Sequence, residues 1–431
     1  MESMYALAEK LFPICRSITG DGVRETLRIL KSEIEDLRII EVPSGTEVFD
    51  WTVPKEWRIR DAFIENSKGE KVIDFRENNL HVMGYSIPVD RVVELSELKQ
   101  YIYVEDSDEE AIPYVTSYYK ERYGFCMSKA QRDALPEDQY HMVIDSELFD
   151  GSLTYGEVIL PGQTDEEIFL STYICHPSMA NNELSGPCVA AKLYQMLKNR
   201  KERKYTYRIV FIPETIGSIT YLSRNLETLK SKVVAGFNIS CVGDDRTYSY
   251  IASRYGDTLA DKVAKNVLRF HYPEYISYSY LERGSDERQY NAPGVDLPVC
   301  AICRSKYGEY PEYHTSKDNL NLISEKGLYG AYEVYEQCIE ALERNAYYQI
   351  QCTCEPQLGK RGLYPTVSKK GSYDGIRTMT NFIAYADGTN DLIDISNWIG
   401  VPVKVLLPIL DQLLEAELIR PVENRKSRED A

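Results

Sequence analysis

The chain has 431 residues, of which 43% are hydrophobic and 27% are charged, and its formal net charge is −17. At about 100 to 200 residues per domain, this length allows two or three domains. The acidic charge argues against a nucleic-acid-binding surface as the main function. No apolar run reaches the roughly 18 residues of a membrane span, and the N-terminus lacks the basic start of a signal peptide. We therefore expect a cytoplasmic protein, with its ten cysteines as free thiols.

The hydrophobic pattern changes twice in the first third of the chain. Residues 5–36 show helical periodicity with a turn at 19–22, which predicts two helices. From residue 42 to 92, short alternating runs are separated by Pro and Asn turns, and this pattern predicts a small inserted β domain. Helical periodicity returns at 95–101 and 114–135, so we expect the β domain to interrupt a larger domain formed by residues 1–41 and 93–350.

The middle of the chain has the pattern of an α/β protein. Apolar, strand-like runs alternate with helical segments, and they lie at residues 155–162, 167–177, 207–214, 233–243 and 296–304. Strands that are almost continuously apolar predict a sheet covered on both faces. After the second run, Ser185 is expected to cap a helix that has Pro187 in its first turn.

The last 80 residues contain three helix-like pieces, TMTNFIAYADG, DLIDISNWIG and VKVLLPILDQLLEAELI. Their layout predicts a winged-helix domain over residues 351–431. Between residues 371 and 420 there are three basic and seven acidic side chains, whereas groove-binding proteins rely on a basic face. We therefore interpret this domain as a packing or protein-interaction module and expect no nucleic acid partner.

Candidate catalytic residues follow the predicted strands. His176 ends the second strand and His314 follows the last, so both are expected at the carboxyl edge, where open α/β sheets place their sites. Glu214 ends the strand YRIVFIPE, where partial burial would raise its pKa toward neutrality and suit a general base. The alternative is a helix N-terminal acid that binds the amides of residues 215–217.

Five motifs in this order carry a family resemblance: HPS…SGP, FIPE, GFNISCVG, GSDERQY and YHTSKDN. They resemble the zinc-dependent exopeptidases, specifically aminopeptidases with two co-catalytic zinc ions. They resemble still more closely a bacterial aminopeptidase-like family of largely unassigned function, often linked to surface-polysaccharide gene sets. That resemblance implies a three-layer α/β fold with a mixed sheet, helices on both faces, a small inserted β domain and a C-terminal winged helix. It also implies that His176 and His314 bind metal and that Glu214 is the catalytic base.

The chain departs from the di-zinc pattern at three carboxylates. Asn182 stands where the bridging aspartate is expected, Thr215 follows the base glutamate, and Ser240 stands in the third strand motif. Uncharged side chains cannot offset two zinc ions held about 3.5 Å apart. Asn182 and Asp244 remain alternative ligands, but a single zinc ion is the better match to this residue set.

We therefore expect His176, Glu183 and His314 to hold one zinc ion with one open position. Glu214 is expected to take a proton from water as it attacks a carbonyl, and to pass that proton to the leaving amine. Asp318, four residues after His314, is expected to orient that imidazole as a hydrogen-bond acceptor.

The stretch LERGSDERQY supplies the predicted substrate contacts. Arg283 and Arg288 suit a substrate carboxylate or an oxyanion. Asp286 and Glu287 suit an amine, or support for a histidine. Surface ion pairs are the alternative for each of these four residues.

Three functions remain open at this point. The first is a zinc hydrolase, either an aminopeptidase or an amidase, that cleaves an amide in a peptide or in an acylated amino sugar or amino acid. The second is a catalytically inactive descendant that binds a ligand or a protein partner. The third, a transcriptional regulator, conflicts with the acidic terminal module. No membrane partner is expected, and contacts between copies of the chain are expected at the insertion and the terminal module.

Overall fold

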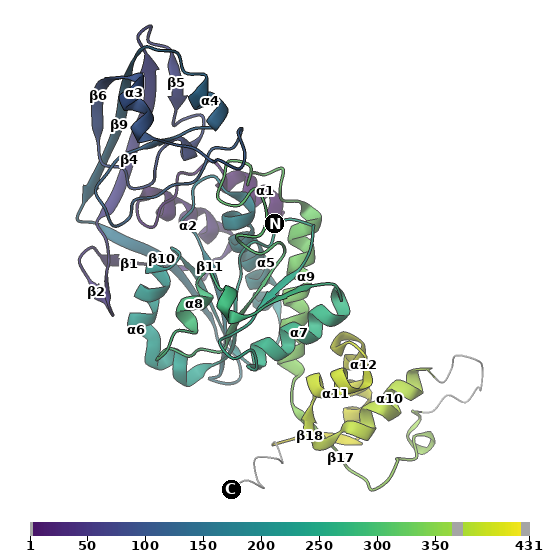
Figure 1. Cartoon of the computed structure of the whole chain (residues 1–431). Helices are drawn as coiled ribbons and strands as arrows, with labels where there is room; N and C mark the ends of the chain where they lie inside the picture. The colour runs from purple at the N-terminus through teal and green to yellow at the C-terminus, as the bar shows by residue number, and fades with distance from the viewer. Residues whose placement is uncertain (1–2, 364–373, 424–431) are drawn as a thin grey trace. The chain divides into compact units, whose positions relative to one another are not determined.

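The computed structural model of the protein describes residues 3–363 and 374–423. The chain forms two compact units (Figure 1). The first unit comprises Met1–Thr258 and Ile276–Tyr332, and the second comprises Leu259–Tyr275 and Glu333–Ala431. Every residue predicted for catalysis, metal binding or substrate binding lies in the first unit.

An eight-stranded mixed sheet forms the centre of the first unit (Figure 1). Its strand order is β1 (Arg38–Pro43), β10 (Ser152–Leu160), β12 (Thr206–Ile212), β11 (Glu167–Tyr173), β13 (Val233–Asn238), β16 (Val299–Cys303), β14 (Ser249–Ile251) and β15 (Ile276–Tyr278). The neighbouring strands β12, β11, β13 and β16 run parallel to one another. β1 is antiparallel to β10, β10 is antiparallel to β12, and β14 is antiparallel to β16. All five strands predicted between residues 155 and 304 belong to this sheet, so the expected α/β core is confirmed.

Helices cover both faces of this sheet. On one face, Tyr155 of β10 packs against Tyr221 of α6 (Ile216–Lys232), with ring centroids 5.5 Å apart. The next residue, Gly156, points to the opposite face, where an added Cβ would collide with Leu27 of α2 (Asp21–Glu33). This alternation is what an extended strand requires. The three-layer arrangement predicted from the apolar strands is therefore confirmed.

Helix α5 (Ser185–Asn199) shares the α2 face and approaches the sheet closely. Gly186 lies against Thr172 of β11 with no room for a Cβ atom, which explains a glycine at the start of this helix. Ser185 is not the predicted N-cap, because its hydroxyl donates to the carbonyl of Asn181 and it already lies within the helix. A π-helical turn, Ala180–Leu184, precedes it and moves the start of the helical segment toward His176.

A separate antiparallel sheet also belongs to the first unit. Its order is β5 (Lys71–Asp74), β4 (Glu56–Asn66), β9 (Gln139–Phe149) and β6 (Val89–Glu94). Tyr140, Met142 and Ile144 of β9 alternate into the core of this sheet. The sheet thus includes residues beyond the predicted 42–92 range, while β1 pairs with the central sheet. The predicted domain boundaries remain a prediction.

Shorter elements complete the first unit. They are α1 (Met4–Leu11), β2 (Glu47–Val48), β3 (Trp51–Thr52), α3 (Leu95–Leu98), β7 (Ile102–Tyr103), β8 (Phe125–Cys126), α4 (Lys129–Asp133) and α8 (Glu287–Tyr290). A helix was expected across residues 114–135, but only α4 forms. Residues from Tyr114 onward bind other loops instead, since the amide of Tyr114 donates to the carbonyl of His314 at 2.8 Å.

The second unit contains the winged helix. Its sheet has the order β18 (Asp387–Asp391), β17 (Tyr347–Ile350) and β19 (Ile419–Val422), and its helices include α7 (Leu259–His271), α10 (Asp374–Tyr385), α11 (Leu392–Ile399) and α12 (Val403–Glu415). α9 (Glu325–Arg344) contributes residues to both units. The three predicted C-terminal helices are confirmed, and α11 and α12 meet at 116°.

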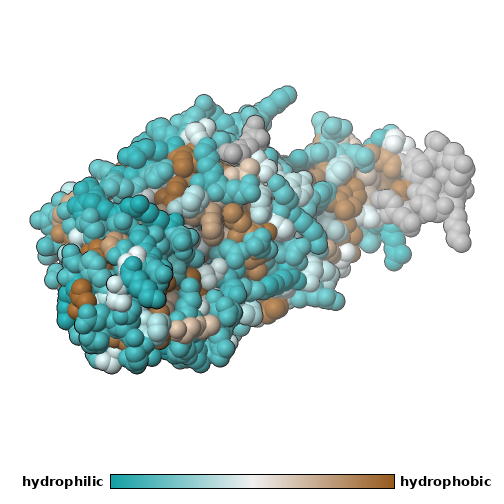
Figure 2. Space-filling view, turned by 90° about the horizontal axis from the view of Figure 1, so that it is seen from above, coloured by the Kyte–Doolittle hydropathy of each residue, from teal (hydrophilic) through white to brown (hydrophobic). Residues whose placement is uncertain are grey.

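Figure 2 shows a face on which hydrophobic side chains form separate patches among hydrophilic ones. In the described part of the chain, no single helix has the length and apolar composition of a membrane span, and only the bent pair of α11 and α12 passes that test jointly.

Candidate active site

A cavity of about 380 Å³ opens at the carboxyl edge of the central sheet. His176 follows β11 and Glu214 follows β12, and because these strands are parallel neighbours their ends meet at this edge. Four residues predicted for the site line the cavity, namely His176, Glu214, Arg288 and His314. The lining also includes four aromatic residues, Trp51, Tyr114, Tyr118 and Tyr119.

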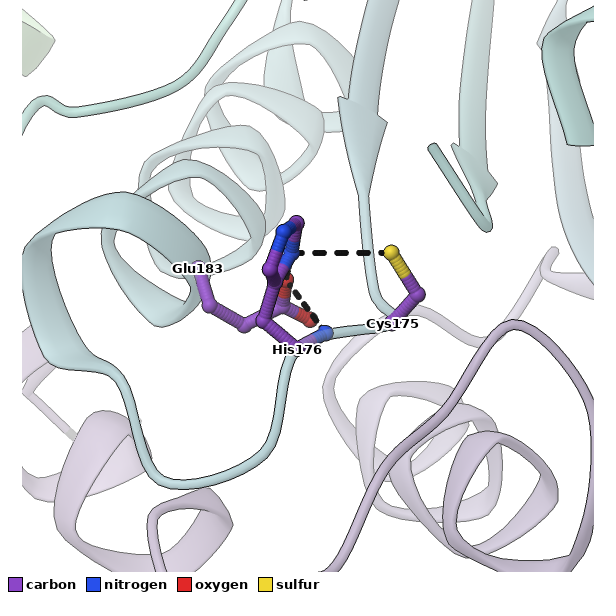
Figure 3. Close-up of side chains that lie close together, drawn as sticks. All are labelled: Cys175, His176 and Glu183. Atoms are coloured by element: carbon purple, nitrogen blue, oxygen red, sulfur yellow. Dashed lines mark hydrogen bonds and ion pairs between the residues drawn. The ribbon is translucent and has the colours of Figure 1, made fainter. Parts of the chain in front are cut away.

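His176 is held by two neighbours, Glu183 and Cys175 (Figure 3). Its Nδ1 atom is hydrogen-bonded to Glu183 Oε2 at 2.9 Å, and its backbone amide donates to the same oxygen at 3.0 Å. Cys175 Sγ lies 3.5 Å from the same Nδ1 atom. Burial and the nearby Arg16 charge lower the pKa of His176 to about 3, so the imidazole is neutral at physiological pH.

Arg16 completes a buried chain behind His176. Its Nε atom donates to the carbonyl of His176 at 2.9 Å and lies 3.4 Å from Glu183 Oε1. Neither the Arg16 nor the Glu183 side chain is exposed to solvent. Burial raises the pKa of Glu183 to about 8, against the opposing effect of the Arg16 charge. Glu183 therefore contacts the back of His176 and does not line the cavity.

His314 supplies the second imidazole. It follows β16 in a loop and has a left-handed backbone with φ of 56°. Its ring centroid lies 5.3 Å from that of His176, and the Tyr114 ring lies 5.1 Å from His314 and 5.2 Å from His176. Burial lowers the pKa of His314 to about 3. Its Nε2 atom is buried and has no hydrogen-bond partner among the described residues.

Glu214 lies next to His176 in the wall of the cavity. Its Oε2 atom lies 3.7 Å from His176 Nε2, and 22% of its side chain is exposed. Burial, and then the nearby Asp286 charge, raise the pKa of Glu214 to about 8. The predicted alternative, a glutamate that binds the amides of residues 215–217, does not occur, because the Thr215 amide donates to Asp286 Oδ1 at 2.8 Å. Thr215 has a φ of 64°, a strain typical of functional sites.

The predicted substrate-binding stretch divides between the cavity and the protein interior. Arg288 lines the cavity and donates to Thr215 Oγ1. Arg283 does not line it, and its guanidinium lies 4.5 Å from the ring centroid of Tyr280. Asp286 and Glu287 are fully buried and also absent from the cavity wall.

Both of these acids bind protein donors. Asp286 accepts from the Thr215 amide and from Ser218 Oγ, each at 2.8 Å. Glu287 accepts from the Gly284 amide at 2.9 Å, from Asn238 Nδ2 at 3.0 Å and from the Tyr307 hydroxyl.

Three further predicted residues have structural contacts. Asp318 does not orient His314 as expected. Its carboxylate instead accepts the amides of Ala180, Asn181 and Asn182 at 3.0, 2.6 and 2.9 Å, at the start of the π-helical turn. Asp244 accepts from Asn181 Nδ2 and from the Ser305 amide and hydroxyl. Asn182 Oδ1 accepts from the Tyr173 hydroxyl at 2.8 Å.

Two groups of atoms are candidates for binding a metal ion. Cys175, His176 and Glu183 place one ligand atom each within 4.8 Å of one another (Figure 3). In that group the His176 Nδ1 atom already bonds Glu183, and the buried Arg16 charge disfavours a second cation. On the cavity side, His176 Nε2 lies 3.7 Å from Glu214 Oε2, and the His314 ring centroid lies 5.3 Å from that of His176. Among the described residues only the first group meets the 4.8 Å spacing, so the cavity-side group is more open. Its donors, two imidazoles and a carboxylate, are of the types that bind zinc.

The positions that a second zinc ion requires hold neutral, hydrogen-bonded side chains. Asn182 is bonded to Tyr173, and Thr215 is bonded to Arg288. Neither can supply the negative charge that a bridging or additional carboxylate provides.

Sequence reasoning missed several residues of this site. Arg16 lies 160 positions before His176, and nothing in its surroundings in the sequence marks it as functional. Tyr114 and Tyr118, whose hydroxyls lie 2.7 Å apart, were hidden in a segment expected to be helical. Cys175 was detectable, because it directly precedes His176 at the end of a strand.

Comparison with known proteins gives two family matches. Residues 5–345 match a family described as "Domain of unknown function (DUF4910)", and residues 345–421 match a family described as "winged helix-turn-helix". A Clostridium acetobutylicum protein, described as a candidate "polysaccharide biosynthesis protein with aminopeptidase-like domain", is 47% identical over 421 residues. That match covers 97% of this chain and 96% of the relative.

Solved structures show the same likeness. A crystal structure of a candidate peptidase from Clostridium acetobutylicum is 46% identical and covers 97% of this chain and 96% of its own, with a TM-score of 0.91. A zinc aminopeptidase from Bacillus subtilis is 12% identical and covers 79% of this chain and 94% of its own, with a TM-score of 0.58. The second comparison shows a shared fold alone. Both agree with the aminopeptidase-like fold expected from the five motifs.

Proposed function

The chain belongs to the DUF4910 family and carries a C-terminal winged helix, and we propose that it is a zinc-dependent hydrolase of aminopeptidase type that cleaves an amide bond. The proposal rests on one observation. His176, His314 and Glu214 converge on one cavity at the carboxyl edge of the sheet. The substrate is a peptide or an acylated amino compound.

His176 and His314 would hold the ion through their cavity-side nitrogens. A neutral His176 that donates its Nδ1 proton to Glu183 keeps the Nε2 lone pair for the metal, as is usual for zinc-bound histidines. Glu183 therefore changes from predicted ligand to positioning residue. When bound, zinc lowers the pKa of water and polarises a carbonyl group.

Glu214 is the proposed general base. Its raised pKa, about 8, lies close to neutrality, so the carboxylate can both accept a proton from water and return it to a leaving amine. Its position 3.7 Å from His176 Nε2 keeps it beside the two imidazoles. Tyr114 and Tyr118 line the same cavity.

The test of this function is hydrolysis of a panel of peptides and N-acyl amino acids by the zinc-loaded chain and by Glu214→Gln. We expect turnover by the wild type and a loss in kcat of about 10² to 10⁴ in the variant, the range typical of a general base. Glu147→Gln, on the surface of the antiparallel sheet, is the matched control and should keep full activity. Absence of turnover on every substrate would favour the ligand-binding alternative.

We also propose a reducing, cytoplasmic location and no nucleic acid partner. All ten cysteines are free and seven of them are buried, which supports a compartment where thiols stay reduced. The winged helix is a common DNA-binding architecture. The proposal that it has no nucleic acid partner therefore rests on the acidic charge of this domain and not on its fold.

A further inference from the structure

We propose that the substrate carries a free carboxylate bound by Arg288, and that the enzyme is an N-acyl amino acid hydrolase and not a consumer of free N-termini. This inference rests on the proposed amide hydrolysis and names its substrate class. It follows from three features of the cavity, which are an unpaired cation, the absence of a second acid, and an apolar wall.

Arg288 is the cation. It extends from α8 into the cavity, and its one hydrogen-bond partner among the described residues is Thr215 Oγ1. The Arg288 charge acts on Glu214 and Asp286, where it lowers the pKa, but among the described residues no carboxylate forms an ion pair with its guanidinium and its buried Nε atom has no hydrogen-bond partner. The free N–H donors of this half-buried fork match a carboxylate. A ligand carboxylate would supply the missing partner.

The cavity wall offers little to a free amine. Glu214 is the one carboxylate among the described residues that line it. Asp286 and Glu287, the acids next to Arg288, are fully buried and bind protein donors. An aminopeptidase must hold the protonated α-amine of its substrate while its base remains free to act. This wall supplies a base and a cation, but no separate anion for an amine.

The remaining wall suits an apolar group. Ile18, Trp51, Tyr114 and Tyr118 face the catalytic groups, and the volume of about 380 Å³ fits a small molecule better than an extended polypeptide. An N-acyl amino acid places a carboxylate two bonds from the scissile amide nitrogen. Its acyl or side-chain carbons can then contact the aromatic wall while the carboxylate reaches Arg288.

The reaction balances with water alone. The oxygen of water forms a bond to the acyl carbon, and the carbon–nitrogen bond breaks. One proton of water moves through Glu214 to the departing nitrogen. The products are a carboxylic acid and an amino acid, and no oxidant or other reactant is required.

The experiment compares three probes on the zinc-loaded full chain: N-acetyl-L-phenylalanine, its carboxamide, and L-phenylalanine p-nitroanilide. We expect kcat/KM for the acid to exceed that for the carboxamide by about tenfold to a hundredfold, as for a charge-assisted bidentate contact. In Arg288→Gln this ratio should fall toward one, and Arg288→Lys should retain part of it. Arg283→Ala, five residues away and outside the cavity, is the matched control and should keep the ratio.

Two outcomes would overturn the proposal. One is preference of the wild type for the anilide, with its free amine, over the N-acetyl acid. The other is an unchanged acid-to-carboxamide ratio in Arg288→Gln. If no probe is cleaved, calorimetric binding of N-acetyl-L-phenylalanine decides the point separately from catalysis. Binding that Arg288→Gln abolishes supports the carboxylate anchor, whereas equal or absent binding in both proteins overturns it.

Discussion

Arg16 and Glu183 fix the orientation of His176 from behind. The guanidinium binds the carbonyl of His176 and lies beside the carboxylate that bonds its Nδ1 atom. Both side chains are fully buried, so each charge depends on the other for compensation. This chain of contacts determines which imidazole nitrogen faces the cavity.

Replacing Arg16 should therefore destabilise the folded protein. We expect Arg16→Met to lower the free energy of unfolding by about 3 to 5 kcal/mol above pH 8, where Glu183 is ionised and would be left buried without a countercharge. Arg16→Met combined with Glu183→Gln should recover part of that loss, as measured by a double-mutant cycle in urea. Strictly additive losses would show that the two side chains are not coupled.

At the scale of elements, the π-helical turn Ala180–Leu184 links the sheet edge to α5. Asp318 accepts three consecutive amides at the start of this turn and also the Tyr310 hydroxyl at 2.9 Å. A helix start whose amides point at a carboxylate is stabilised by hydrogen bonds and by the helix dipole. This contact positions Glu183, which lies within the turn.

We expect Asp318→Asn to destabilise the protein by about 1 to 3 kcal/mol, since at least one buried amide loses a charged acceptor. Chemical denaturation measures this change. The matched control is Asp245→Asn, at an exposed ion pair with Lys326 of 3.6 Å, which should shift stability by less than about 0.5 kcal/mol. Equal effects of the two substitutions would contradict the capping role of Asp318.

Some of these elements could be predicted from the sequence and others could not. Apolar runs predicted five of the eight strands of the central sheet, and the residues at their ends, His176 and Glu214, were found because strand ends are easily located. The role of Asp318 was not predictable, because it depends on a loop contact across 136 to 138 positions. The helix expected at 114–135 failed because its tyrosines pack on the site and not on a helix face.

At the scale of the molecule, the buried acids make the metal-free protein lose stability as the pH rises from 6.5 to 8. Burial raises the pKa of Glu183 and of Glu214 from 4.5 to about 8, so the folded state holds protons that the unfolded chain has released, and stability falls as pH rises toward 8. Burial lowers the pKa of His176 and of His314 from 6.5 to about 3, so below pH 6.5 the two histidines lose stability as the pH falls, and this loss offsets the gain from the two acids.

Urea denaturation of the metal-free chain at pH 5.5, 6.5 and 8 tests this pH dependence. In Glu183→Gln the loss of stability between pH 6.5 and 8 should be smaller, because one titrating group is gone. A wild-type stability that rises from pH 6.5 to 8 would contradict the assignment of raised pKa values to these acids.

The winged helix gives a second prediction at this scale. Lys262 of α7 is engaged within the second unit by Asp391 at 2.6 Å and Asp394 at 2.7 Å, and acids outnumber bases between residues 371 and 420. We expect the full chain to show no salt-sensitive binding to a labelled DNA duplex, as measured by fluorescence anisotropy. Affinity that falls steeply with salt would indicate phosphate contacts and revive the regulatory alternative.

The measurement that tests the central claim most directly is zinc content by mass spectrometry of the purified full chain. We predict about one zinc ion per chain, lost in His176→Ala and in His314→Ala, because these imidazoles face one cavity. His141→Ala, which removes a half-exposed histidine paired with Asp90 on the antiparallel sheet, should retain the ion. No zinc after reconstitution, or an ion that persists in both cavity variants, would contradict the account.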